Sequence, residues 1–183
     1  MIAAAHADSV PQGPPLPLAA LFEEHHAAVF RAAYRITGDA ADAEDVLQTV
    51  FVRLLRREDD LDLSDSAASY LHRAAVNAAL DLLRSRRRSR AVALADVEGG
   101  LEETEPGPER SRGARELAGR LRAALTRLSP KSAEIFALRY FEERSNLEIA
   151  RLLGVSQTSI AVILHRARHR LRKELAPLHG GLS

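Results

Sequence analysis

The sequence has no cysteine and no tryptophan among its 183 residues, and aromatic residues make up only 4%. Without cysteine, the chain can form neither disulfide bonds nor thiolate metal sites. Alanine, leucine and arginine recur throughout, which favours helices over strands. No run of about 18 apolar residues occurs, so we expect no membrane span. No basic segment precedes an apolar stretch between Met1 and Leu16, so we expect no signal peptide, and these absences fit a cytoplasmic protein.

Charged residues are distributed unevenly, although they sum to a net charge of only +1. A basic block comes first, then an acidic stretch from Asp96 to Glu109, and then a second basic cluster. The block contains Arg84, Arg86, Arg87, Arg88 and Arg90, and the cluster contains Arg166, Arg168, Arg170, Arg172 and Lys173. This order indicates two surfaces that face a polyanion, with a spacer between them. The alternative is that these arginines only solvate exposed helix faces.

Apolar residues recur every three to four positions in the first half of the chain, which is the spacing of amphipathic helices. We expect one helix over 17–37, ended by Gly38, and a second that begins at Asp39 or Asp42. An acidic loop over 58–65 precedes a third helix, which runs from about 66 to the basic block. These helices predict a first domain over 17–90, preceded by a flexible tail over 1–16.

The middle of the chain is rich in glycine and proline. Residues 91–113 combine these residues with the acidic stretch, so we expect a largely unstructured linker. Helical spacing resumes at Leu117, and Pro130 is well placed as the first residue of another helix. We therefore expect a second helical domain over 114–176 and a tail over 177–183. The predicted fold class is all-α, with two small helical domains joined by a flexible linker.

The segment from Ser145 to Leu171 carries the most specific pattern. Ser145 and Glu148 are spaced as a capping box, in which each side chain satisfies a free backbone amide of the other residue. Gly154 supplies a tight turn, and Ser156 can cap a longer second helix. This is the pattern of a helix-turn-helix, whose second helix lies in the major groove of DNA. A helical hairpin that binds no DNA is the alternative, and the basic cluster argues against it.

These residues resemble region 4 of the extracytoplasmic-function (ECF) sigma factors, which direct bacterial RNA polymerase to promoters. The matching segments are Ser145-Asn146-Leu147-Glu148-Ile149-Ala150, Leu153-Gly154-Val155-Ser156 and Leu164-His165-Arg166-Ala167-Arg168. In the first domain, Asp42-Ala43-Glu44-Asp45-Val46-Leu47-Gln48 with Val50-Phe51 is similar to the polymerase-binding helix of the family's region 2. Tyr70-Leu71-His72-Arg73, with Asn77, Asp81 and Leu83-Arg84, is similar to its promoter-melting helix.

The resemblance implies roles for three sets of residues. Core polymerase would be bound by Asp42, Asp45, Val46, Gln48 and Phe51. The melted −10 strand would be contacted by Tyr70, Arg73, Asn77, Arg84, Arg86 and Arg87, while the loop over 58–69 would receive a flipped base. The −35 element would be contacted by Ser156, Gln157, Thr158, Ser159, His165, Arg166 and Arg168.

The resemblance also implies a region 2 bundle of three to four helices and a four-helix region 4. The implied partners are core RNA polymerase, promoter DNA and an anti-sigma factor. The free chain would be a monomer that uses no cofactor and no small-molecule substrate and is not a membrane protein.

Some positions depart from the family pattern. Ala161, Val162 and Ile163 stand where basic or polar residues are common, which predicts weaker −35 recognition. Tyr70 stands where tryptophan is common, and Ala67-Ala68 replaces a bulkier pair. Two alternatives stay open. One is a stand-alone helix-turn-helix regulator, which predicts a dimer on a palindromic site. The other is a divergent member that binds polymerase but binds DNA only weakly.

Catalysis is the function class with the least support in the sequence. His165 and His169 have a spacing that can hold zinc, but the neighbouring arginines would repel a cation. No glycine-rich phosphate loop or nucleophile motif completes a site. We therefore expect neither an enzyme nor a metal site.

Overall fold

The computed structural model describes residues 18–56, 67–96 and 109–176, and every regular element within these ranges is a helix. The helices are α1 (Leu18–Thr37), α2 (Ala40–Leu55), α3 (Ala67–Asp96), α4 (Glu109–Leu125), α5 (Pro130–Tyr140), α6 (Asn146–Leu153) and α7 (Gln157–Leu175). The all-α prediction is confirmed. The predicted tails over 1–16 and 177–183 and the acidic loop over 58–65 lie outside the described residues.

Helices α1, α2 and α3 pack against one another as the predicted first bundle. Their buried core includes Val29, Ile36, Val46, Leu54 and Leu71. Gly38 ends α1 with a φ of +71°, a left-handed conformation that glycine adopts without steric cost. Asp39 is the N-cap of α2, since its side chain accepts a hydrogen bond of 2.9 Å from the backbone amide of Asp42.

The predicted linker is shorter than the sequence pattern suggested. Helix α3 continues past the basic block to Asp96, and α4 already begins at Glu109. Arginine, alanine and leucine are good helix formers, and no glycine or proline interrupts α3 between 67 and 96. The acidic residues alone gave no reason for the helix to stop at 90. Only residues 97–108 separate the two helices, and they lie outside the described residues.

The second half of the chain forms the predicted helical domain. Helix α7 packs against α4, α5 and α6. The axes of α6 and α7 differ by 109°, which lies within the range of helix-turn-helix units. No single helix in the described ranges is long and apolar enough to cross a membrane; only the bent pair of α6 and α7, taken together, has the length and composition for it.

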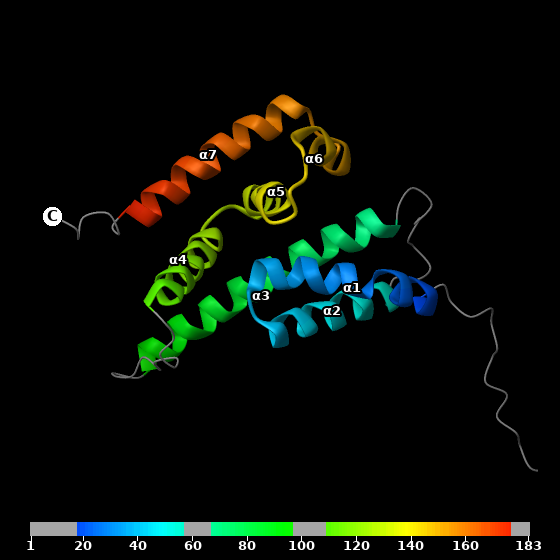
Figure 1. Ribbon diagram of the computed structural model, residues 1–183, viewed down its shortest axis with the longest axis horizontal. Coiled ribbons are helices and arrows are strands. Elements are labelled where there is room, and N and C mark those ends of the chain that lie inside the picture. The colour runs from blue at the N-terminus through cyan, green and yellow to red at the C-terminus, as the bar shows by residue number, and fades with distance from the viewer. Residues whose placement is uncertain (1–17, 57–66, 97–108, 177–183) are drawn as a thin grey trace, which may run out of the picture.

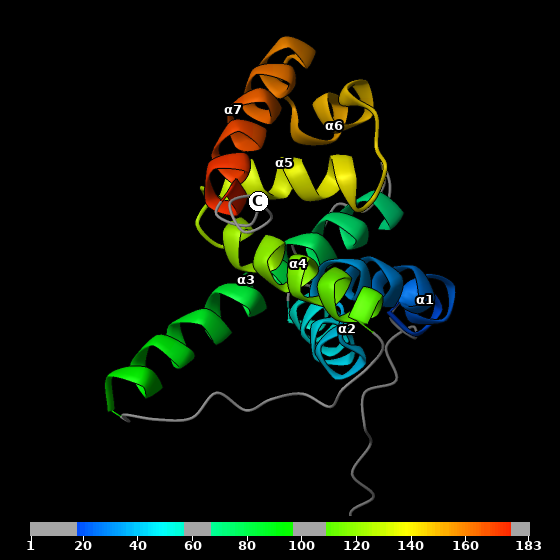
Figure 2. The ribbon, with the colours of Figure 1, turned by 60° about the vertical axis from the view of Figure 1, so that its left-hand side comes forward.

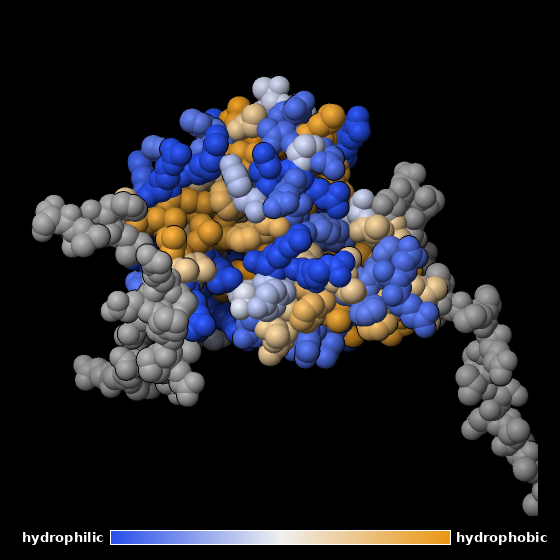
Figure 3. Space-filling view, in the orientation of Figure 1, coloured by the Kyte–Doolittle hydropathy of each residue, from blue (hydrophilic) through white to orange (hydrophobic). Residues whose placement is uncertain are grey.

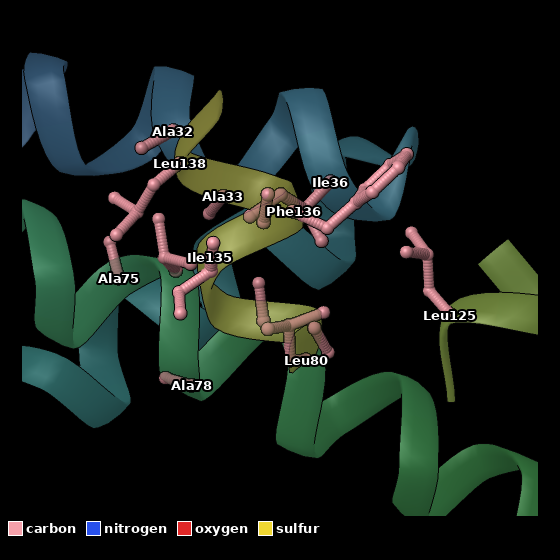
Figure 4. Close-up of a cluster of buried hydrophobic side chains, with 14 of the residues drawn as sticks. Ala32, Ala33, Ile36, Ala75, Ala78, Leu80, Leu125, Ile135, Phe136 and Leu138 are labelled. Atoms are coloured by element: carbon pink, nitrogen blue, oxygen red, sulfur yellow. The ribbon is translucent and has the colours of Figure 1, made fainter. Parts of the chain in front are cut away.

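The two helical domains are packed together. In both ribbon views, α5 lies between α7 on one side and α1 and α3 on the other (Figures 1 and 2). All six residues from Ala133 to Leu138 are buried, so α5 is covered all round. Figure 4 shows Ile135 and Leu138 of α5 lying beside alanines of α3 and α1. The alanines of α1 and α3 let the helices approach closely, so α5 belongs to the core of both domains.

Candidate nucleic-acid and polymerase interfaces

Short-range hydrogen bonds fix the turn between α6 and α7. The predicted capping box at the start of α6 is present: the amide of Ser145 donates to Glu148 at 2.8 Å, and the amide of Glu148 donates to the Ser145 hydroxyl at 3.2 Å. Gly154 ends α6 at a φ of +63°. Ser156 then caps α7 by accepting a hydrogen bond of 3.2 Å from the amide of Ser159. These caps therefore fix where α6 begins and ends and where α7 begins.

Helix α7 has one buried and one exposed face. Ile160, Leu164, Ala167 and Leu171 are buried at intervals of three and four residues. The predicted −35 residues are all exposed: Ser156, Gln157, Thr158, Ser159, His165, Arg166 and Arg168. Figure 3 shows hydrophilic side chains along the outer side of the C-terminal half of α7. This face offers positive charge, which attracts phosphates, and hydrogen-bond donors that can bind the acceptor atoms of a nucleic acid.

The exposed face of α7 also contains the apolar interruption seen in the sequence. Ala161 and Val162 are exposed, with 43% of Val162 accessible, whereas Ile163 is half-buried. Beside Ala161 lies a hollow of about 410 Å³, lined also by Arg139, Asn146, Gln157 and Arg168. Polar and charged groups therefore flank the apolar residues on the same face.

On α2, the predicted polymerase-binding residues divide into two sets. Asp45 and Gln48 are exposed and three positions apart, so one face offers a carboxylate and an amide. Val46 and Phe51 are buried in the core of the first bundle. Asp42 is also buried and pairs with Arg86 of α3. Burial raises the pKa of Asp42 above its usual value, and the attraction of Arg86 opposes this shift only in part.

On α3, the predicted strand-binding residues lie together at one hollow. Tyr70, Arg73 and Asn77 line a space of about 320 Å³, whose other walls are Val50, Arg53 and Ala74. However, Arg73 and Asn77 both donate to a single oxygen of Glu134 on α5, at 2.7 and 2.9 Å. Two of the three predicted contacts are therefore occupied within the chain.

The predicted arginines at the end of α3 also have partners within the described residues. Arg84 pairs with Asp81 at 3.0 Å, one turn away on the same helix. Arg86 pairs with the buried Asp42. Arg87 donates to the hydroxyl of Thr126, beyond α4, at 3.2 Å. Of these three pairs, only that of Arg87 and Thr126 joins the first domain to the second.

The residues at the domain boundary that were not predicted from the sequence include Arg122, Glu134 and Glu142. One signal was available, because Glu134 is the only charged residue in the apolar run from Ala133 to Leu138. A lone acid in such a run requires a partner. No local pattern identified Arg122 or Glu142. Within residues 18–56, 67–96 and 109–176, no group of three or more histidines and acids is arranged to hold a metal ion.

Comparisons with known families agree with this division of the chain. The family described as Sigma-70 region 2 matches residues 21–89. The family described as Sigma-70, region 4 matches residues 118–171. The first match covers most of α1, all of α2 and most of α3, and the second covers the last part of α4, all of α5 and α6 and most of α7.

Two curated relatives illustrate the similarity. The chain is 34% identical over 156 residues to the ECF RNA polymerase sigma factor SigE of Mycolicibacterium smegmatis, which covers 85% of this chain but only 60% of that relative. It is 32% identical over 160 residues to the ECF RNA polymerase sigma factor SigL of Mycobacterium tuberculosis, which covers 87% of this chain and 89% of that relative.

A solved structure is similar in fold. The structure of CnrH in complex with the cytosolic domain of CnrY superposes with a TM-score of 0.52 and 24% identity, covering 87% of this chain and 88% of that one. With the two region matches in order and a relative of 32% identity matched along nearly its whole length, the chain belongs to the ECF RNA polymerase sigma factors.

Proposed function

We propose that this chain binds core RNA polymerase and directs it to specific promoters. In this proposal, the first domain contacts the polymerase through the Asp45 and Gln48 face of α2 and the melted −10 strand through α3. The second domain contacts the −35 element through α7. Like sigma factors generally, the chain initiates transcription and is not an enzyme itself. We assign it to the cytoplasm, where its polymerase acts, with promoter DNA and an anti-sigma factor as its further partners.

One observation carries this proposal: the chain contains two separate candidate surfaces of different chemistry. The start of α7 exposes hydroxyls and an amide, and its later turns expose arginines. Such groups bind phosphates and base edges. The α2 face exposes a carboxylate and an amide, which suit a basic protein surface. A stand-alone DNA-binding protein needs only the first surface, whereas a polymerase specificity subunit needs both.

A direct test is transcription in vitro with core polymerase and fragments of the source genome, followed by mapping of transcript start sites. The proposal predicts that the chain co-migrates with core polymerase in size-exclusion chromatography and adds start sites that core alone does not use. A chain that neither co-migrates nor adds start sites contradicts it. A dimer that binds a palindromic site without polymerase would instead support the stand-alone regulator.

A second candidate function has specific support on α7. The exposed Ala161 and Val162 occupy positions from which a side chain can reach DNA, and neither can donate a hydrogen bond. A chain that binds polymerase but binds −35 DNA weakly would have this composition. In the same transcription assay, it would form the polymerase complex yet depend little on the −35 sequence. Replacing the −35 sequence of a mapped promoter distinguishes the two functions.

A further inference from the structure

Glu134 is a buried acid that joins the two domains. Its side chain is 9% exposed, and one of its oxygens accepts hydrogen bonds from Arg73 Nε and Asn77 Nδ2. Its neighbours on α5 are apolar and also buried. A buried carboxylate is costly unless charged or polar donors compensate it, and Arg73 and Asn77 both belong to α3. Glu134 is therefore satisfied only while α5 lies against the first domain.

A second acid, just beyond the end of the same helix, repeats this arrangement. The Glu142 side chain is 3% exposed and lies 3.0 Å from His72 Nε2 and 3.3 Å from Arg35 Nη1. His72 belongs to α3 and Arg35 to α1. Arg35 also donates to the carbonyl oxygen of Phe141 at 3.4 Å. Glu134 lies within α5 and Glu142 lies just beyond its last residue, Tyr140, and both acids face basic groups of the first domain.

The apolar surface of α5 agrees with these polar contacts. Ile135 and Leu138 have no exposed surface, and they lie beside alanines of α1 and α3 (Figure 4). A helix that packed only against α6 and α7 would leave one side to solvent, and that side would be polar. In this chain that side of α5 carries the apolar residues Ile135 and Leu138, so it is suited to pack against the first domain.

We propose that Glu134 and Glu142 form an intramolecular latch that closes the free chain and occupies Arg73 and Asn77, so that single-stranded DNA must displace α5 to reach them. This inference rests on the proposed function for its biological meaning, because it concerns the side chains assigned to the melted strand. The carboxylate of Glu134 takes the place that a phosphate or a base acceptor would occupy. The closed state therefore lowers the affinity of the free chain for single-stranded DNA. Once the domains separate, Arg73 and Asn77 are free to bind the strand.

The latch can open because its polar contacts are not fully satisfied. Glu142 Oε1 is buried and accepts no hydrogen bond within the described residues. A buried oxygen without a donor carries a desolvation cost, which reduces the net gain from closing. Arg73 is still 45% exposed, so solvent screens its ion pair with Glu134 and reduces what the pair contributes to closing. These features describe a reversible contact rather than a permanent domain interface.

The test uses the full chain with glutamine at both positions, Glu134→Gln and Glu142→Gln. Glutamine keeps the size of the side chain and removes the charge. Because the natural sequence has no cysteine, Ala27→Cys on α1 and Lys173→Cys on α7 allow a donor and an acceptor dye to report domain separation. The matched control is Glu23→Gln with Glu116→Gln, two exposed acids that change the net charge equally. Circular dichroism verifies that each variant keeps its helices.

Binding is measured with a labelled single-stranded oligodeoxynucleotide in the absence of polymerase. The latch variant should show lower energy transfer and an affinity increased by about fivefold or more, within the usual range of coupling between states. The control pair should change neither. Equal gains in both pairs, which would reflect charge alone, overturn the proposal. So does reduced energy transfer without a gain in affinity, or no change in either readout.

A locked chain tests the same claim in the opposite direction. Ala28 of α1 and Glu143 line one hollow between the domains, so cysteines there can be joined by a cleavable thiol cross-linker. The linked chain should bind the oligonucleotide more weakly than the unlinked chain, and cleavage should restore binding. Unchanged binding after cross-linking contradicts the latch. Failure of the unmodified chain to support transcription with core polymerase would instead contradict the proposed function, and it would leave the energy-transfer result intact.

Discussion

Arg122 of α4 donates a hydrogen bond of 2.9 Å from Nε to the carbonyl oxygen of Ile36, near the end of α1. The last carbonyl groups of a helix have no partner within it, so a side chain from the other domain caps α1 here. The guanidinium group of Arg122 also covers Gly38: a Cβ atom on that glycine would lie 2.0 Å from Nη2. The end of α1 is therefore completed by the second domain.

Replacing Gly38 should destabilise the chain for two reasons. Gly38→Ala puts a side chain on a left-handed residue, which costs about 1–2 kcal/mol, and it displaces Arg122 from its capping position. The free energy of unfolding from urea titration should fall by at least that amount. Gly119→Ala is the matched control: it lies in α4 with open space around it, so it should be neutral or stabilising. Equal effects of both substitutions would contradict the role of Arg122.

The exposed face of α2 gives a prediction about polymerase binding. Asp45→Arg reverses the charge of the proposed contact and should abolish association with core polymerase, while thermal unfolding stays unchanged because the side chain is exposed. Size-exclusion chromatography with core polymerase measures the association. Glu23→Arg on α1 makes the same charge change on another exposed residue and should have little effect. Unchanged affinity of Asp45→Arg would rule out this face.

The exposed arginines of α7 give a prediction about promoter binding. Arg166→Ala should weaken promoter binding by the holoenzyme and leave core binding unchanged. If Arg166 contacts a phosphate, the slope of log affinity against log salt should decrease by about one unit. Arg115→Ala on α4 is a control for loss of one exposed positive charge. Loss of core binding in Arg166→Ala would show that α7 serves the polymerase and not the DNA.

Local patterns predicted most of the helices, and the reason lies in the residues themselves. The residues that cap or end the helices contact groups only a few positions away in the sequence, so their roles can be inferred from spacing alone. These residues are Gly38, Asp39, Ser145, Gly154 and Ser156. The sequence predicts the end of α3 too early, because the linker predicted over 91–113 rests on an acidic stretch and on glycines and prolines that begin only at Gly99. Arginine-rich segments remain helical when no glycine or proline interrupts them.

Contacts between the domains could not be predicted in the same way. Arg73 and Glu134 are separated by 61 positions, and Arg122 and the carbonyl of Ile36 by 86. Such pairs depend on how two helical bodies pack, which spacing within one helix does not encode. The same reason explains why Asp42 was grouped with Asp45: both belong to one acidic motif, but only Asp45 is exposed. A polymerase-binding role for Asp42 stays a prediction.

Asp42 gives a prediction about the dependence of stability on pH. Burial raises its pKa, so the folded chain holds the charged form less well than water does. With a raised pKa in the folded state, the protonated Asp42 side chain stabilises the fold at pH values below the usual aspartate pKa, about 3.9. This contribution to the free energy of unfolding is lost as the pH rises through the pKa of Asp42 in the folded chain. Asp42→Asn should therefore be more stable than the natural chain at neutral pH, with the difference fading in acid. A variant less stable at neutral pH would show that the pair with Arg86 outweighs burial.

The capping box of α6 gives the opposite dependence on pH. Hydrogen bonds from Ser145, above all, lower the pKa of Glu148. A lowered pKa stabilises the fold at pH values above the usual glutamate value, about 4.3, and this contribution is lost as the pH falls through the folded value. Glu148→Gln should therefore be less stable than the natural chain at neutral pH, and the two should converge in acid. A difference that stays constant with pH would mean that the charge of Glu148 contributes nothing.

Ser145 tests the same cap through its hydroxyl. Ser145→Ala removes the acceptor for the amide of Glu148 and should reduce the free energy of unfolding by about 1 kcal/mol. Ser85→Ala, on the exposed face of α3, removes a hydroxyl that caps no helix and should change it little. Because α6 supports the start of α7, Ser145→Ala should also weaken promoter binding by the holoenzyme more than Ser85→Ala does. Equal promoter affinity in the two variants, with Ser145→Ala clearly less stable, would mean that α6 supports the fold but does not set the position of α7 on DNA.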